Sequence, residues 1–191
     1  ITVAVGPVSS TWNISTTMSG CSPVGTVCSD GTVYAGLSVA SAPMYVTRCD
    51  LGMTWNGSAC TGSRLHYSWN NGNNTGYTTA SASSSTDGQA NTATLVATDS
   101  DSSIAGTQQH QAAQACKNLT DSGHSDWYLP ARNEMSTIYA NYGTIGNFTT
   151  SDQYWTSTET ASSGAYEIWL GSGTVDADLK LSLRSVRCAR R

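Results

Sequence analysis

Six cysteines constrain this chain more than any other feature of its 191 residues. An even number of cysteines in a chain with few charged side chains favours disulfides over free thiols. Two pairs flank short segments rich in turn residues, so each pair can close locally, and the remaining two cysteines would join a helix to the last strand. The spacing therefore predicts three disulfides, which are Cys21–Cys28, Cys49–Cys60 and Cys116–Cys188.

A metal site is the alternative use of these cysteines. The sequence has no Cys-x-x-Cys pair, and none of its three histidines, His66, His110 and His124, has ligand spacing to a cysteine. We therefore expect neither a metal ion nor another cofactor.

The composition favours a secreted or surface-displayed protein. Only 12% of the residues are charged, about half of the usual 25%, and the hydroxyls of Ser and Thr take their place. No apolar run approaches the ~20 residues that a membrane span requires, so we expect no such span. The chain opens at Ile1 without an initiator Met or a signal peptide, and we expect a processed form.

The charge balance argues against a general nucleic-acid binder. The net charge is −4, whereas nucleic-acid binding needs a concentrated basic surface. Five of the nine basic residues nevertheless lie close to the C-terminus, namely Lys180, Arg184, Arg187, Arg190 and Arg191. They suggest either a patch for an anionic ligand or a solvated edge strand and tail, and the second interpretation is favoured.

The sequence pattern indicates an α+β domain at 30–191, preceded by a stalk, linker or assembly segment at 1–29. Apolar residues at helical spacing predict one helix over 107–119 and a second that begins at Pro130 and ends at Gly143. Residues 78–92 are polar and loop-like, and 91–97 suit a short strand or the approach to a helix. Strands are expected near 32–36, 44–47, 65–69, 154–158, 166–170, 174–183 and 186–188, with a break at Ser185.

Three sequence blocks in a fixed order carry a family resemblance. They are Gly123-His-Ser-Asp126-Trp127-Tyr128-Leu129-Pro130, Tyr154-Trp155-Thr-Ser-Thr-Glu159 and Val186-Arg187-Cys188-Ala-Arg190. Together they resemble the family typified by the C-terminal domain of a bacterial collagen-like adhesin, over roughly 30–191. The resemblance implies a C-type-lectin-like fold with two helices, antiparallel sheets and a disulfide from the first helix to the last strand.

The motifs of an enzyme or of a calcium-dependent lectin are missing. The sequence has no Gly-x-Ser-x-Gly, no His-Glu-x-x-His and no phosphate-binding loop. It also lacks the Glu-Pro-Asn, Gln-Pro-Asp and Trp-Asn-Asp triplets that hold calcium and sugar in true lectins. Glu134 is expected to cap a helix rather than to act in catalysis. We therefore expect a protein that is not an enzyme.

Aromatic side chains are the main candidates for ligand contacts, because exposed Trp and Tyr stack on sugars and anchor protein interfaces. Trp127, Trp155 and Trp169 lie in the family blocks and are expected in the core. The candidates for ligand binding are Trp55, Tyr67, Trp69, Tyr77, Arg184 and Arg187. For the four aromatic residues among them, packing in the core is an equal alternative.

These observations predict an adhesin or receptor-binding module that recognises a cell-surface glycan or protein. The alternative is a structural subunit or tip of a pilus, fibre or surface layer, in which 1–29 makes the polymer contact. A homo-oligomer or filament is expected in the second case, and no nucleic-acid partner in either.

Overall fold

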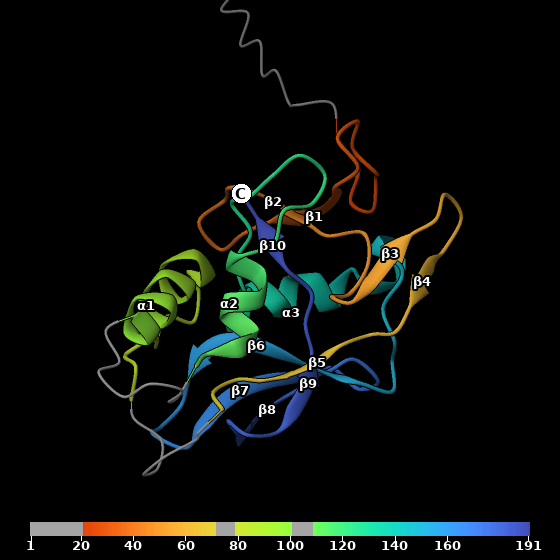
Figure 1. The fold of residues 1–191 in the computed structure, drawn as a ribbon. Coiled ribbons are helices and arrows are strands. Elements are labelled where there is room, and N and C mark those ends of the chain that lie inside the picture. The colour runs from red at the N-terminus through yellow and green to blue at the C-terminus, as the bar shows by residue number, and fades with distance from the viewer. Residues whose placement is uncertain (1–20, 72–78, 101–108) are drawn as a thin grey trace, which may run out of the picture.

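The computed structural model describes residues 21–71, 79–100 and 109–191, in which strands and helices are mixed in an α+β arrangement (Figure 1). The helices are α1 (Gly88–Ser100), α2 (Gln111–Lys117), α3 (Arg132–Ala140) and α4 (Tyr142–Ile145). The strands of the first half are β1 (Val33–Leu37), β2 (Pro43–Val46), β3 (Met53–Trp55), β4 (Cys60–Gly62) and β5 (His66–Ser68). Those of the second half are β6 (Gln153–Glu159), β7 (Gly164–Trp169), β8 (Thr174–Leu179), β9 (Leu183–Ser185) and β10 (Ala189–Arg190).

The strands of the described chain form three sheets. A small sheet has the order β1-β2-β10, the β3–β4 hairpin stands alone, and a five-stranded sheet has the order β5-β9-β6-β7-β8. The small and the large sheet lie toward opposite ends of the molecule with helices between them, and the β3–β4 hairpin projects to one side (Figure 1). The expected antiparallel pairing holds except between β6 and β9, which are parallel.

The two predicted helices are present but are not the only ones. The first was expected over 107–119 and is α2, and the second, expected from Pro130 to Gly143, is α3 followed by the short α4. Helix α1 was not predicted: 78–92 were expected to be loop-like, and 91–97 a short strand or the approach to a helix. The strand is not formed, and the helix was hidden because it is rich in Thr and Ala and has no apolar stripe. Of its apolar side chains, Leu95 is fully buried. Its start is instead specified by Asp87, whose Oδ1 accepts a hydrogen bond from the Ala90 N–H at 3.1 Å.

One carboxylate serves the N-termini of two helices. Glu134, which is fully buried, accepts hydrogen bonds at Oε2 from the N–H of Ala131 at 2.8 Å and from that of Gly88 at 3.0 Å. Its Oε1 accepts the Tyr128 hydroxyl at 3.2 Å and contacts the Arg191 guanidinium. A Cβ at Gly88 would lie 2.5 Å from the Ala131 nitrogen, so this approach of α1 to α3 requires glycine. The predicted capping role of Glu134 is therefore confirmed.

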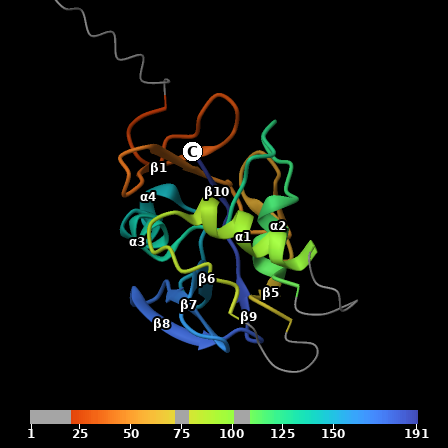
Figure 2. The same ribbon diagram turned by 90° about the vertical axis from the view of Figure 1, so that its left-hand side faces the viewer.

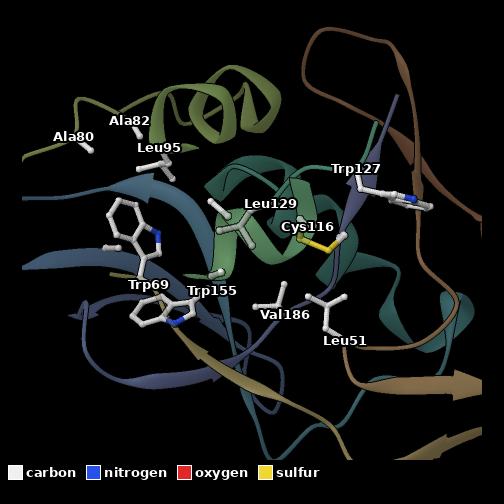
Figure 3. Packing of buried hydrophobic residues seen from close by; sticks show 14 residues of the cluster. Leu51, Trp69, Ala80, Ala82, Leu95, Cys116, Trp127, Leu129, Trp155 and Val186 are labelled. Atoms are coloured by element: carbon white, nitrogen blue, oxygen red, sulfur yellow. A yellow bond between two sulfur atoms is a disulfide. The ribbon is translucent and has the colours of Figure 1, made fainter. Parts of the chain in front are cut away.

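The core consists of two apolar clusters. One contains the buried indoles of Trp69, Trp127 and Trp155. Figure 3 shows Trp69 and Trp155 beside the strands of the large sheet and Trp127 beyond the Cys116 disulfide. The other packs α3 against β1, β2 and the opposite face of β6 and β7. Trp127 and Trp155 occupy the core as predicted, but Trp169 is 46% exposed. The prediction for Trp169 was wrong because the neighbouring Ile168 takes the core-facing position at the end of β7.

All three predicted disulfides are confirmed. Their Cα–Cα distances are 5.1 Å for Cys21–Cys28, 5.7 Å for Cys49–Cys60 and 5.5 Å for Cys116–Cys188. The last of these joins α2 to the residue before β10, and Figure 3 draws its sulfur–sulfur bond at Cys116. Figure 2 shows where α2 and β10 lie in the fold. No helix in the described ranges is long and apolar enough to cross a membrane.

Replacing Cys116 and Cys188 together by Ser should destabilise the domain more than replacing Cys21 and Cys28. The bond at Cys116 closes a loop of 72 residues and that at Cys21 a loop of 7. A disulfide restricts the unfolded chain more when it closes a longer loop. We therefore expect the free energy of unfolding to fall by about 4 kcal/mol without Cys116–Cys188 and by about 2 kcal/mol without Cys21–Cys28. Urea denaturation of the two double variants checks this order, and a reversed order would contradict it.

Candidate functional site

The basic residues near the C-terminus are neutralised by carboxylates from elsewhere in the chain. Each contacts at least one acidic partner, in the pairs Lys180–Glu159, Arg184–Glu167, Arg184–Asp178, Arg187–Asp50, Arg190–Asp126, Arg191–Asp87 and Arg191–Glu134. These partners lie on loops, on strands and on α3. The cluster is therefore neither an open anionic-ligand patch nor a solvated tail, and both expectations are corrected. These ion pairs instead connect the C-terminal segment to the rest of the domain, and we call them together the ionic clasp.

The most buried ion pair of the clasp is that between Arg187 and Asp50, whose side chains are fully buried. Arg187 Nε lies 2.6 Å from Asp50 Oδ1. The other carboxylate oxygen, Oδ2, accepts hydrogen bonds from Arg64 Nε at 2.6 Å and from the Tyr154 hydroxyl at 2.7 Å. Burial, followed by the charge of Asp50, raises the pKa of Tyr154 well above its ordinary value, so the phenol stays protonated.

Arg187 also holds the backbone around it. Its guanidinium donates to the carbonyl of Thr47 at 3.0 Å and to that of Asn147 at 2.7 Å, and it stacks on Phe148 at 3.9 Å from the ring centroid. Two backbone bonds add to this, from the N–H of Thr47 to Cys188 O and from that of Leu51 to Val186 O. The segment 47–51 is thereby fastened to the C-terminal strand.

A cleft of about 330 Å³ lies along this fastened segment. Residues 47–55 form one side, and the turn after α2, with Leu119, Asp121 and Ser122, forms the other. The Cys49–Cys60 disulfide closes the β3–β4 hairpin that carries Trp55, and Cys116 lies three residues before Leu119. Both sides of the cleft are therefore held by disulfides, so its shape is preformed.

Two polar groups of the cleft lack partners among the described residues. Thr47 is only 4% exposed, and its hydroxyl has no hydrogen-bond partner in the part of the chain that the structure describes. The Arg48 guanidinium carbon lies 3.6 Å from the ring centroid of Trp55. Within the described ranges the Arg48 guanidinium has no carboxylate at ion-pair distance, in contrast to the basic residues near the C-terminus. The Thr47 hydroxyl has almost no solvent-accessible surface, so Arg48 and Trp55 are the side chains of this group that the cleft offers to a ligand.

The residues predicted for ligand binding do not form one site. Trp55 lines the cleft, whereas Tyr67 borders a separate depression with Gln111 and Asn118. Arg184 bridges Glu167 and Asp178 on the large sheet. The remaining two described candidates are buried, and the last, Tyr77, lies outside the described residues.

Trp69 and Arg187 are the two buried candidates, each 1% exposed. The indole N–H of Trp69 donates to the Thr156 carbonyl at 2.8 Å, and its ring packs edge-on against His110. For Trp69 the core-packing alternative therefore holds, whereas the expected surface position of Arg187 was wrong, because its guanidinium satisfies its polar groups inside the core. Arg48 and Thr47 were missed, since no motif or periodicity distinguishes them from other residues that end a strand.

The described residues contain no group of three or more His, Cys, Asp or Glu side chains that could hold a metal ion. His110 is the most buried histidine, and both of its ring nitrogens have neighbours. Nδ1 lies 2.7 Å from Asp99 Oδ1, and Nε2 lies 3.0 Å from Asn70 Nδ2. The first contact joins the end of α1 to the start of α2, and the second joins His110 to the segment after β5, so His110 has a structural environment.

Substitution of Arg187 by Met should destabilise the domain strongly. Asp50 would be left as a buried carboxylate with Arg64 as its single cationic partner, and breaking a buried pair in this way costs about 3–5 kcal/mol. Arg190→Met is the matched control, because its partner Asp126 is 44% exposed and such pairs contribute about 0–1 kcal/mol. Thermal and urea unfolding distinguish the two variants, and equal losses would contradict the role given to Arg187.

Comparisons with known proteins identify the family. No curated protein matches the chain. A crystal structure of a fimbrial protein from Bacteroides ovatus ATCC 8483 is similar over 77% of this chain, with 11% sequence identity and a TM-score of 0.44. The chain spans 35% of that protein's length. A family model, that of the Lcl C-terminal domain, matches residues 45–190, which include both sides of the cleft and all of the ionic clasp except Arg191. The chain therefore belongs to the Lcl C-terminal domain family.

Proposed function

We propose that this chain is an extracellular, non-enzymatic recognition module that binds a cell-surface glycan or protein in the cleft beside Arg48. The observation that carries the proposal is the Arg48 guanidinium, which stacks on the Trp55 indole beside a preformed hollow and has no carboxylate at ion-pair distance among the described residues. Ligand sites of proteins combine such an apolar surface with a few well-placed polar groups.

The groups along the cleft suit a hydroxyl-rich ligand. The guanidinium of Arg48 offers several hydrogen-bond donors. Across the cleft, the Ser122 hydroxyl donates to Asp121 at 3.1 Å, which leaves lone pairs of that carboxylate for ligand hydroxyls. Saccharides present hydroxyls of both roles together with apolar faces, so we favour a glycan over a protein as the ligand.

The disulfides and the composition of the chain support an extracellular site of action. Three disulfides persist in oxidising compartments and are rare in the cytosol. The low charged fraction of 12% also supports an extracellular location, because a surface rich in hydroxyls in place of charges is typical of secreted proteins.

We further propose that the fold is C-type-lectin-like and that binding does not need calcium. The three sequence blocks that carry the resemblance contribute Trp127, Trp155 and Cys188 to one core cluster, and the helix-to-C-terminus disulfide matches the resemblance. The calcium-binding triplets of true lectins are missing from the sequence.

A glycan array and a cell-binding assay test the proposal, each with and without a calcium chelator. We expect binding that the chelator leaves unchanged. Arg48→Gln and Trp55→Ala should each weaken it about 10- to 100-fold, as expected for loss of a charged hydrogen bond or of an aromatic contact.

The matched controls are Arg190→Gln and Trp169→Ala, since neither residue lines the cleft, Arg190 is paired with Asp126 and Trp169 is exposed. These variants should bind as the unmodified chain does. No binding in either assay, or equal losses in the controls, would reject the proposal.

A further inference from the structure

A third segment of the chain reaches the cleft beside Arg48. The lining of the cleft includes Gly31, which belongs to the turn 28–32 that precedes β1. A Cβ built on Gly31 would lie 3.2 Å from Ser122 Oγ. The turn 28–32 therefore reaches the side of the cleft that follows α2.

The register of the small sheet places this turn at the end of the cleft where the chain leaves β2. Val33 of β1 lies opposite Val46 of β2 in an antiparallel pair. Continued by two residues past the strand ends, this register brings Gly31 level with Arg48. The turn thus extends from Arg48 on one side of the cleft to Ser122 on the other, and it closes this end.

One carboxylate shapes the turn and fastens it across the cleft. Asp30 Oδ1 accepts hydrogen bonds from the N–H and the hydroxyl of Thr32, at 2.9 Å and 2.8 Å. Asp30 Oδ2 lies 2.9 Å from Nε2 of His124, two residues after Ser122. Burial acts to raise the pKa of Asp30, but the hydrogen bonds from Thr32 and His124 outweigh it and lower this pKa below its ordinary value. Asp30 is therefore an anionic acceptor at neutral pH.

The turn that carries His124 is anchored in the core. His124 and Asp121 exchange two backbone hydrogen bonds, at 2.9 Å and 3.1 Å. The indole N–H of the buried Trp127 donates to the His124 carbonyl at 3.2 Å. Asp121 and Ser122 of the same turn line the cleft. The contact between Asp30 and His124 therefore joins the turn 28–32 to a fixed part of the cleft wall.

This contact is near the surface. The side chains of His124 and Asp30 are 27% and 36% exposed, and pairs of such exposure contribute little to global stability. The other carboxylate whose charge interacts with His124 across the turn, that of Asp126, is paired with Arg190. Removal of the His124 side chain should therefore release the turn 28–32 without unfolding the domain.

We propose that the turn 28–32 is an end wall of the ligand site, held by Asp30 and His124, so that the cleft receives the non-reducing terminal sugar of a glycan and not an internal stretch. A glycan that continued past this end would meet the backbone at Gly31. The cleft volume of about 330 Å³ is at the small end for ligand pockets, as a terminal unit requires. The proposal rests on the glycan binding proposed above.

The test compares two forms of the glycan that binds most strongly on the array, one unchanged and one lengthened by one sugar at its free end. The unmodified chain should bind the lengthened form at least about tenfold more weakly, because the end wall excludes the added sugar. In His124→Ala the released turn should reduce this difference to less than about threefold. His124→Gln keeps a side-chain N–H for Asp30 and should retain the difference. Asp126→Ala, which does not line the cleft, is the control and should also retain it.

Hydrogen–deuterium exchange without any ligand tests the fastening itself. Amides of 28–32 should exchange faster in His124→Ala than in the unmodified chain, and His124→Gln and Asp126→Ala should leave their exchange unchanged. Melting temperatures show that each variant is folded. Unchanged exchange in a folded His124→Ala would overturn the role of this contact.

The end wall is overturned if the unmodified chain binds both forms of the glycan equally. It is also overturned if His124→Ala keeps the full difference although exchange in 28–32 has risen. Absence of any glycan binding would overturn this inference together with the proposed function, whereas equal binding of the two forms would overturn the end wall alone.

Discussion

The buried ion pair between Arg187 and Asp50 is the contact on which the candidate site depends. It joins the C-terminal segment to the chain that leaves β2, and the same guanidinium holds the carbonyls of Thr47 and Asn147. The adjacent residue, Cys188, is cross-linked to α2. A buried charge pair of this kind gives modest net stability but imposes one arrangement, since every alternative leaves a charge unpaired. The position of the cleft follows from this arrangement.

The other cations of the C-terminal segment are likewise paired with carboxylates from elsewhere in the chain. A chain with 12% charged residues has few of them, and it uses those near its end to fasten strands and α3 rather than to solvate the surface. Arg48 differs, because an indole rather than a carboxylate lies beside it in the described structure. Arg132 likewise stacks on an aromatic ring, that of Tyr166, so the cleft is distinguished by the hollow beside Arg48 and Trp55 and not by the stacking alone.

The sequence predicted the features that depend on local pattern. Cysteine spacing predicted the three disulfides, and helical periodicity predicted α2 and α3. Helix α1 was missed because its specificity comes from Asp87 and from Glu134, which lies far along the chain. The burial of Trp69 and the exposure of Trp169 depend on which face of the sheet each strand presents. Residue type and spacing do not contain that information.

The central claim, that the cleft beside Arg48 is where this domain meets its ligand, is tested most directly by hydrogen–deuterium exchange. The domain would be saturated with the glycan that it binds most strongly on the array. Protection is predicted in peptides covering 47–55 and 119–122, which form the two sides of the cleft. Protection confined to 66–71 and 111–118, around Tyr67, with no change along the cleft, would contradict the account.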